Sequence, residues 1–155
     1  MAHEIERKFL VINESYKQMA VRSHKIAQGY ISRQKEGTVR VRVRDDKAFL
    51  TIKGVNHGIS RSEWEYPVPE ADAREMLREV CGGAVLEKTR WIVEYQGFTW
   101  EVDEFHGRLA PLVVAEVELP DACLEPPLPP FVGREVSDDP QYYNSVLIEK
   151  LTAAK

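Results

Sequence analysis

The sequence predicts a mainly β (α+β) fold, an antiparallel eight-stranded closed β-barrel with a polar, charged interior and helices packed outside. Three observations support this prediction. Segments that alternate apolar and charged residues succeed one another along most of the chain. Turn signals separate these segments, as in antiparallel hairpins. Charges of one sign gather on particular strand faces, which solvation alone does not require.

The predicted strands rest on alternation between two faces. Residues 3–12 begin with Glu4-Ile5-Glu6-Arg7-Lys8 and continue as an apolar run, and alternate residues of a strand share a face. Residues 38–44 alternate valine with arginine, and an Asp45-Asp46 turn leads back into residues 48–53. The eight predicted strands are 3–12, 22–32, 38–44, 48–53, 61–68, 85–95, 98–105 and 112–119.

Few helices are predicted, and the clearest lies between the fifth and sixth strands. It opens at Pro69 with Glu70, carries apolar residues at helical spacing and ends at Gly82-Gly83. We expect residues 14–20 to form a short helix or turn, and residues 141–151 to form a C-terminal helix.

Length and composition exclude several classes of protein. With 155 residues, the chain is expected to form one domain over residues 1–155. Its net charge of -4 argues against a nucleic-acid-binding protein, and Cys81 and Cys123 form neither a disulfide framework nor a metal-ligand pair. No apolar signal segment opens the chain and no apolar run is long enough to cross a bilayer. We therefore expect a cytoplasmic protein without a membrane partner.

One face of the predicted strands collects nearly all of their charged side chains. For a single strand, exposure of that face to solvent would be the simpler interpretation. However, Arg40, Arg42 and Arg44 lie together, and Glu116 and Glu118 form a separate acidic pair. Such blocks repel and cost stability unless they serve a ligand. The face holds eight carboxylates and seven cations, so opposed walls nearly balance, and we place it inside the barrel as a wet, polar tunnel.

The charged face is suited to a metal ion together with a phosphorylated anion. Carboxylate oxygens are preferred ligands of Mg²⁺ and Mn²⁺. Arginine presents a planar fork to phosphate oxygens, and lysine acts as a point charge. The chain contains no glycine-rich phosphate loop, so we expect side chains to hold the phosphates.

The order of these residues resembles a known family. Glu4-x-Glu6-x-Lys8 resembles the ExExK signature of the triphosphate tunnel metalloenzymes, also called the CYTH domain superfamily. Members of this family have an antiparallel eight-stranded barrel whose tunnel holds a triphosphate and a divalent metal. The similarity continues in one order through Arg40-x-Arg42, Thr51-Ile52-Lys53-Gly54, Arg61-x-Glu63-x-Glu65, Glu87-Lys88-x-Arg90, Asp103, Glu116-x-Glu118, Gly133-Arg134-Glu135-Val136 and Asp139-Pro140-x-Tyr142-x-Asn144.

The resemblance implies a role for each group of tunnel residues. The ligands of Mg²⁺ or Mn²⁺ would be Glu4, Glu6, Asp103, Glu116 and Glu118. The phosphate-binding residues would be Lys8, Arg40, Arg42, Lys53, Lys88 and Arg90. Lys8 and Tyr30 would form a dyad that activates water, although a packed strand residue is an equal interpretation of Tyr30. Further tunnel-lining residues would be Glu63, Glu65 and Glu101.

The activity implied by the resemblance is that of a metal-dependent inorganic triphosphatase, which hydrolyses tripolyphosphate to pyrophosphate and phosphate. A class IV adenylate cyclase and a thiamine or nucleoside triphosphatase are alternatives, since they use the same tunnel. A non-catalytic polyphosphate-binding module is a third alternative, although anion binding alone needs no set of five carboxylates. The expected partner is a small-molecule triphosphate, with no nucleic acid and no membrane, and we expect a monomer or a homodimer.

Overall fold

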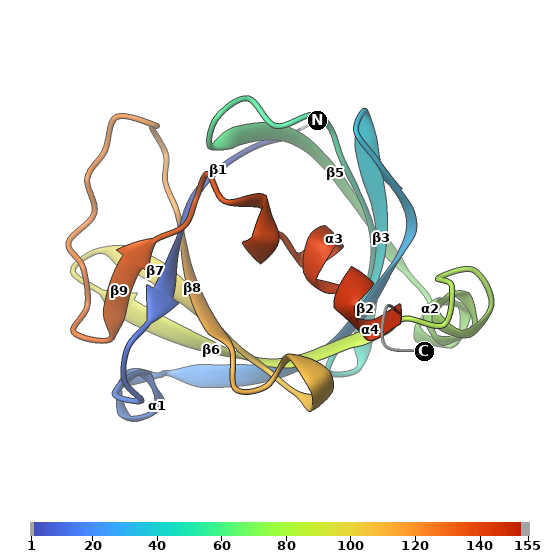
Figure 1. Cartoon of the computed structure of the whole chain (residues 1–155), viewed down its shortest axis with the longest axis horizontal. Helices are drawn as coiled ribbons and strands as arrows, with labels where there is room; N and C mark the ends of the chain where they lie inside the picture. The colour runs from blue at the N-terminus through green and yellow to red at the C-terminus, as the bar shows by residue number, and fades with distance from the viewer. Residues whose placement is uncertain (1, 153–155) are drawn as a thin grey trace.

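The computed structural model describes residues 2–152 and consists mainly of strands wound into a barrel (Figure 1). The strand order is β5-β4-β3-β2-β6-β7-β8-β1-β9, and an additional pairing of β5 with β1 closes the sheet. The predicted closed, antiparallel barrel of β1 to β8 is therefore confirmed. The strands are β1 (Ala2–Val11), β2 (Arg22–Gln34), β3 (Gly37–Arg44), β4 (Lys47–Lys53), β5 (Ser60–Val68), β6 (Leu86–Tyr95), β7 (Phe98–Phe105), β8 (Val113–Glu118) and β9 (Val132–Glu135).

The first strand closes the barrel because its two halves pair with different neighbours. Glu4 lies opposite Arg61 in the antiparallel pairing of β1 with β5. Further along β1, Lys8 lies opposite Glu116 in the pairing with β8. The residues of the ExExK signature therefore lie where the first, fifth and eighth strands meet.

The ninth strand was absent from the prediction. β9 pairs with β1 at Phe9 and Val11, on the edge that β5 leaves free. Its sequence, VGRE, has no alternating apolar pattern. A Cβ atom at Gly133 would lie 2.5 Å from Ile12 Cγ2, so the close approach of β9 to the β1 end requires a glycine. Local alternation alone could not have identified this strand.

Two tight turns agree with the hairpins predicted from the sequence. The turn between β3 and β4 contains Asp45 at φ 55°. The turn between β6 and β7 contains Gln96 at φ 47° and Gly97 at φ 84°. Positive φ angles are what a short turn between twisted antiparallel strands requires.

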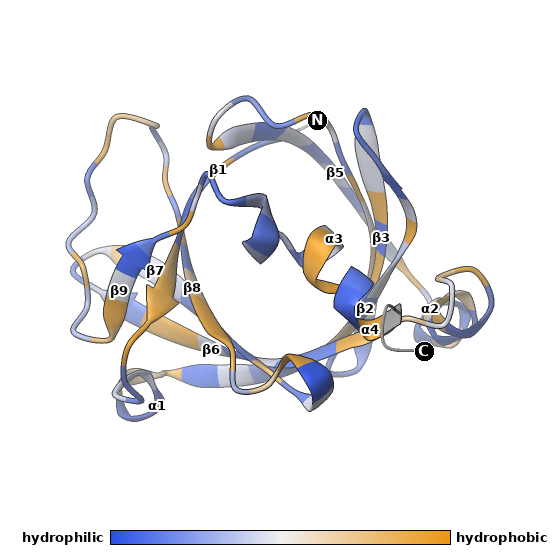
Figure 2. Cartoon of the chain, in the orientation of Figure 1, coloured by the Kyte–Doolittle hydropathy of each residue, from blue (hydrophilic) through white to orange (hydrophobic). Residues whose placement is uncertain are grey.

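Helices and loops cover much of the apolar outer face of the barrel. α1 contributes Tyr16 to an apolar cluster in which Trp100 and Phe131 are fully buried. α2 packs Ala73 and Leu77 against the valines of β3. Figure 2 shows hydrophobic and hydrophilic residues alternating along the barrel strands. The helices are α1 (Tyr16–Met19), α2 (Glu70–Glu79), α3 (Asn144–Leu147) and α4 (Glu149–Thr152), with 3₁₀ turns η1 (Gly107–Leu109) and η2 (Pro140–Tyr142).

The C-terminal segment differs from the predicted continuous helix. It is divided into η2, α3 and α4, and it lies across one opening of the barrel rather than outside it (Figure 1). Leu86, Phe105 and Val114 lie on the charged inner face of their strands and pack with Leu147 of α3. The C-terminal segment therefore buries the apolar surface that these residues would otherwise expose at this end of the barrel. No helix within residues 2–152 is long and apolar enough to span a bilayer.

An ion-pair cluster outside the barrel joins β1 to β9. The Arg7 guanidinium donates to both oxygens of Glu135, at 2.9 and 2.6 Å, and to Glu125 at 2.8 Å. Ser137 Oγ donates to Glu135 at 2.7 Å and accepts from the Lys8 backbone N–H at 2.9 Å. The cluster thereby connects the start of the C-terminal segment to the strand that carries Lys8.

Replacing Glu135 with Gln is expected to lower the free energy of unfolding at pH 7 by about 0.5–1 kcal/mol, discounted for solvent screening of a partly exposed pair. Hydrogen bonding from Arg7 lowers the pKa of Glu135, so the charged carboxylate stabilises the folded state above the unfolded pKa. This stabilisation is lost as the pH falls through the lowered folded-state pKa. The stabilities of wild type and variant in urea unfolding should therefore converge as the pH falls below that folded-state pKa, and a pH-independent difference would contradict the assignment.

Candidate functional site

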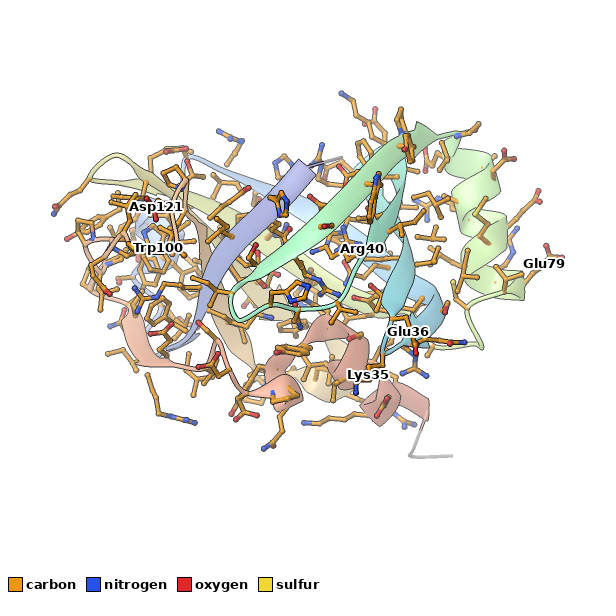
Figure 3. All side chains as sticks on the ribbon, turned by 90° about the horizontal axis from the view of Figure 1, so that it is seen from above. Lys35, Glu36, Arg40, Glu79, Trp100 and Asp121 are labelled. Carbon is orange, nitrogen blue, oxygen red and sulfur yellow. The ribbon has the colours of Figure 1, made fainter. Side chains whose placement is uncertain are left out.

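The charged face predicted from alternation lies inside the barrel. In Figure 3, Arg40 lies near the centre of the molecule, whereas Glu79 of α2 lies at its periphery. Side chains from seven strands converge there because each strand turns alternate residues inward. The buried polar residues among those described are Lys8, Gln28, Arg40, Arg42, Thr51, Lys88, Arg90, Asp103 and Glu116.

Asp103 is the centre of the most buried ion-pair cluster. Arg90 Nε lies 2.7 Å from Asp103 Oδ1, and Arg90 Nη2 lies 2.9 Å from Oδ2. Lys88 Nζ lies 2.6 Å from the same Oδ2. Burial alone would raise the pKa of Asp103, but Arg90 and Lys88 lower it to about 2. Asp103 is therefore a carboxylate held charged by two cations.

A carboxylate side is formed by β1 and β8, with Glu4, Glu6, Glu116 and Glu118 as its members. Burial, and then repulsion from Glu116 and Glu4, raises the pKa of Glu6 well above its usual range. Although burial alone would raise it, the proximity of Lys8 and Arg90 lowers the pKa of Glu116 well below its usual range. Since a bound cation would offset the repulsion between these carboxyl groups, the donor set fits a hard divalent metal.

Lysines pair with two members of the carboxylate side, Glu4 and Glu116. Lys53 Nζ lies 2.9 and 3.1 Å from the two oxygens of Glu4. Lys8 Nζ lies 3.4 Å from Glu116 Oε1. Within residues 2–152, no group of three or more carboxylate, imidazole or thiol side chains is arranged closely enough to hold a metal ion. The predicted ligands thus lie near one another while several are paired with cations.

The opposite side of the interior carries excess positive charge. Arg40 Nη2 donates to Thr51 Oγ1 at 3.2 Å and lies 3.8 Å from Glu65. Arg42 Nε donates to Gln28 Oε1 at 2.8 Å, and no ion pair of the described residues joins Arg42 to a carboxylate. Burial, and then the proximity of Arg40 and Arg90, lowers the pKa of Arg42 to about 9. A buried guanidinium without a counter-charge is a favourable position for an anion.

A cavity of about 70 Å³ opens between the ExExK residues and the C-terminal segment. The Lys8 ammonium, beside this cavity, donates to the Tyr142 backbone carbonyl at 2.9 Å. Lys88 Nζ donates to Asn144 Oδ1 at 3.2 Å. The C-terminal segment therefore contacts two of the predicted phosphate-binding lysines. The lining residues are Glu4, Glu6, Lys8, Tyr30, Thr38, Arg40, Lys53, Asn56, Gly58, Ile59, Arg61, Ser137, Tyr143, Asn144 and Ser145.

The predicted dyad residues, Lys8 and Tyr30, both line this cavity. The Lys8 ammonium also approaches the Tyr143 ring, with 5.8 Å to its centroid. The Tyr30 ring is half-buried and packs partly against the apolar cluster that contains Leu147. Both interpretations of Tyr30 therefore have a structural counterpart, and its catalytic role stays a prediction.

The remaining predicted residues lie at different depths. Lys88, Arg90 and Asp103 form the deep cluster described above, and Lys53 lies 3.9 Å from Glu63. Glu101 lies 3.3 Å from Arg90 and, with Glu118, lines a separate pocket beside the β6–β7 turn. Glu118 is exposed, so Glu116 and Glu118 differ in environment although the sequence pattern treats them alike.

Sequence reasoning assigned no individual roles to two kinds of residue at the site. The first kind lies in the C-terminal segment, where Tyr142 and Asn144 contact the lysines. Their presence in the matched Asp139–Asn144 stretch was the only signal for them. The second kind is Gln28, which shares the inner face of β2 with Tyr30. Its spacing of two from Tyr30 could have revealed it.

The fold and the site together define a class of protein: a closed barrel whose interior offers buried arginines and lysines to a compact polyanion and a carboxylate side to a cation. A family model described as the CYTH domain matches residues 2–143. The chain belongs to the CYTH family.

Relatives of this chain extend the comparison. An inorganic triphosphatase of Acetivibrio thermocellus is 48% identical over 149 residues, covering 96% of this chain and 95% of that protein. An inorganic triphosphatase of Nitrosomonas europaea is 34% identical over 148 residues, covering 93% and 95%. A crystal structure of an inorganic triphosphatase superposes with a TM-score of 0.67 at 31% identity, covering 96% of this chain and 95% of the other.

Exchange of Arg90 and of Arg42 for Met should have unequal consequences for stability. Arg90→Met leaves Asp103 buried with Lys88 as its nearest cation, so we expect a loss of about 3 kcal/mol in the free energy of unfolding. Arg42→Met removes a buried charge that has no carboxylate partner but leaves Gln28 Oε1 without its donor, so we expect a loss of no more than about 1 kcal/mol. Urea unfolding without added metal or phosphate compares them, and equal losses would refute the distinction.

Proposed function

We propose that this protein is a metal-dependent inorganic triphosphatase that hydrolyses tripolyphosphate to pyrophosphate and phosphate inside the barrel. The observation that carries the proposal is the buried Arg42, which lacks a carboxylate partner among the described residues, across the interior from the mutually repelling carboxyl groups of Glu6 and Glu116. Two relatives that nearly match the length of this chain are named for this activity. The proposal includes Mg²⁺ or Mn²⁺ as the cofactor, a cytoplasmic location and a monomeric or homodimeric single domain.

The proposed roles follow from charge and position in the barrel. Burial strengthens electrostatic attraction, so interior cations would bind phosphate more strongly than surface cations. The phosphate-binding set is Lys8, Arg40, Arg42, Lys53, Lys88 and Arg90, and the metal-binding set is Glu4, Glu6, Asp103, Glu116 and Glu118. Of the metal-binding set, Glu6 and Glu116 have the strongest support, because their carboxyl groups lie close enough for Glu116 to disfavour the charge on Glu6. Asp103, which has two cationic partners, has less.

The reaction would use these residues mainly for positioning and charge stabilisation. A bound divalent ion would supply Lewis-acid polarisation of the phosphate and a more acidic water. Arginine and lysine donors would hold the non-bridging oxygens and stabilise the charge that spreads over them during phosphoryl transfer. Lys8, with Tyr30 on the same cavity, would be placed to orient the attacking water.

The charged lining of the cavity supports a phosphorylated substrate. The C-terminal segment, with Asn56, Gly58 and Ile59, lines the cavity and leaves about 70 Å³. This volume is below the several hundred Å³ usual for small-molecule sites, so any triphosphate would need this end to open, and a nucleotide would need more room for its base and ribose. A cyclase or a nucleoside or thiamine triphosphatase would therefore need a larger rearrangement at this end. A non-catalytic binding module would not require the acidic residues that face the cations.

The purified protein with Mg²⁺ or Mn²⁺ should release phosphate from tripolyphosphate faster than from ATP, GTP or thiamine triphosphate. The measurement is phosphate release over a substrate panel at matched concentration, with cyclic AMP detected in the ATP reaction. Efficient turnover of a nucleotide without tripolyphosphate turnover would overturn the proposal. Tight tripolyphosphate binding without turnover in any metal would favour the binding module.

Replacing Glu116 with Gln should lower kcat by more than about 100-fold, the upper range for residues that merely support a metal ligand. The matched control is Glu87→Gln, an exposed carboxylate on the outer face of β6, which should keep wild-type activity. Circular dichroism establishes that both variants are folded before steady-state rates are compared. Retained activity in a folded Glu116→Gln protein would rule out Glu116 as a metal ligand.

A further inference from the structure

Gln28 is a fully buried polar residue on the inner face of β2, and no role has been assigned to it above. It lies opposite Arg42 of β3 on one side and opposite Leu86 of β6 on the other. Its relative exposure is 0%. A glutamine at such a position needs partners for both ends of its amide, because an unmade hydrogen bond of a buried polar group is costly.

Only one end of this amide has a partner. Gln28 Oε1 accepts a hydrogen bond from Arg42 Nε at 2.8 Å. This contact fixes the orientation of the amide, because exchange of oxygen and nitrogen would place two donors against each other. Gln28 Nε2 is buried and has no hydrogen-bond partner among residues 2–152. The free donor therefore belongs to a side chain whose other end is held by an arginine.

A second buried donor without a partner lies on the neighbouring strand. Arg40 Nε has no hydrogen-bond partner within the described part of the chain. Arg40 lies opposite Tyr30, two residues from Gln28 along β2, so Gln28 and Arg40 are diagonal neighbours on the inner face. Residues in this relation are about 7–8 Å apart, within the reach of two long side chains to one extended anion.

The location of these donors distinguishes them from other buried polar atoms without partners. Trp100 Nε1 also lacks a partner, but Trp100 belongs to the apolar cluster outside the barrel. Gln28 and Arg40 instead face the interior that also contains Arg42. Two unsatisfied donors beside a guanidinium without a counter-charge match a ligand that only accepts hydrogen bonds and carries negative charge, which describes phosphate.

We propose that Gln28 is a substrate-binding residue, whose Nε2 donates to a phosphate oxygen in a subsite shared with Arg42. The inference rests on the proposed triphosphatase function and adds a neutral donor to its set of charged phosphate-binding residues. In this subsite, Gln28 has two functions: its oxygen holds the Arg42 side chain in place, and its nitrogen contacts the anion.

Two substitutions separate these functions. Gln28→Leu removes both the acceptor and the donor at nearly constant size. Gln28→Glu keeps an acceptor for Arg42 Nε but replaces the donor with a carboxylate oxygen, which repels phosphate. Gln34→Leu is the matched control, because Gln34 is an exposed glutamine at the end of the same strand.

The experiment measures KM and kcat for tripolyphosphate, and its Kd by calorimetry without added metal. Both Gln28 variants should raise KM and Kd by about 10- to 100-fold, as expected for a lost hydrogen bond to a charged group. The effect on kcat should be small, since the contact is made in the bound substrate as well as during reaction. Gln34→Leu should leave all three constants unchanged.

A purely structural role for Gln28 predicts a different result. If Gln28 acts only by holding Arg42, adding Gln28→Leu to Arg42→Met will leave Kd at the Arg42→Met value, which refutes the inference, whereas a further rise supports direct contact. Gln28→Met replaces Gln28→Leu in this comparison if the leucine variant does not fold. If the wild type binds tripolyphosphate without hydrolysing it, the triphosphatase proposal fails, while the Kd values still test the subsite. If the wild type does not bind tripolyphosphate at all, both proposals fail.

Discussion

The interior of this barrel depends on the pairing of buried charges, and Asp103 is the residue on which most of that pairing rests. The carboxylate is 1% exposed and receives three short contacts from Arg90 and Lys88. Removing one partner of such a cluster leaves a charge that cannot reach water, which makes the arrangement costly to break. The antiparallel pairing of β6 with β7 places Arg90 directly opposite Asp103. Strand register and interior electrostatics therefore constrain each other.

This pairing does not extend to the whole interior. Arg42 lies close enough to Arg90 and Arg40 for their charges to disfavour its own, and its hydrogen-bond partner is the neutral Gln28. On the carboxylate side, burial and the proximity of Glu116 and Glu4 disfavour the charged form of Glu6, although Lys8 lies 3.4 Å from Glu116. Both features are unfavourable in the protein alone and are relieved by an anion and a cation, respectively. Stability and ligand binding therefore make opposite demands on these positions.

The sequence predicted the barrel and most of its inner face because strand geometry is periodic. Alternation in Thr38–Arg44 and Glu4–Lys8 places charged residues on one face irrespective of tertiary contacts. The same reasoning did not identify Gln28, because β2 mixes polar and apolar residues on both faces. Gln28 lies two residues from Tyr30 in the sequence, but both side chains are neutral, so the pattern of charged residues did not include them. The pairing of Lys53 with Glu4 was also inaccessible, since it depends on side-chain reach across the closed barrel.

The C-terminal segment shows a different limit of sequence reasoning. The sequence predicted one continuous helix over residues 141–151, but the extended backbone at Tyr143 separates η2 from α3. The reason is tertiary: Leu147 packs on the apolar end of the inner face, and Asn144 contacts Lys88. Only the complete barrel creates the surface on which this conformation is favourable, so local propensity is overridden.

That segment also determines how a ligand can reach the lysines. The Lys8 ammonium donates to the Tyr142 carbonyl, and the Lys88 ammonium donates to the side-chain oxygen of Asn144. In the proposed reaction, both ammonium groups would bind phosphate instead. A phosphate oxygen that accepts a hydrogen bond from one of these ammonium groups replaces a neutral acceptor. Because the phosphate oxygen is charged, it forms the stronger hydrogen bond. The exchange is therefore favourable once the anion is inside. Release of Lys53 from Glu4 and of Lys8 from Glu116 then leaves two carboxylates without their cations. In the proposed function, those carboxylates would bind a divalent ion more strongly than before, and anion and metal binding would then favour each other by the same free energy in either order.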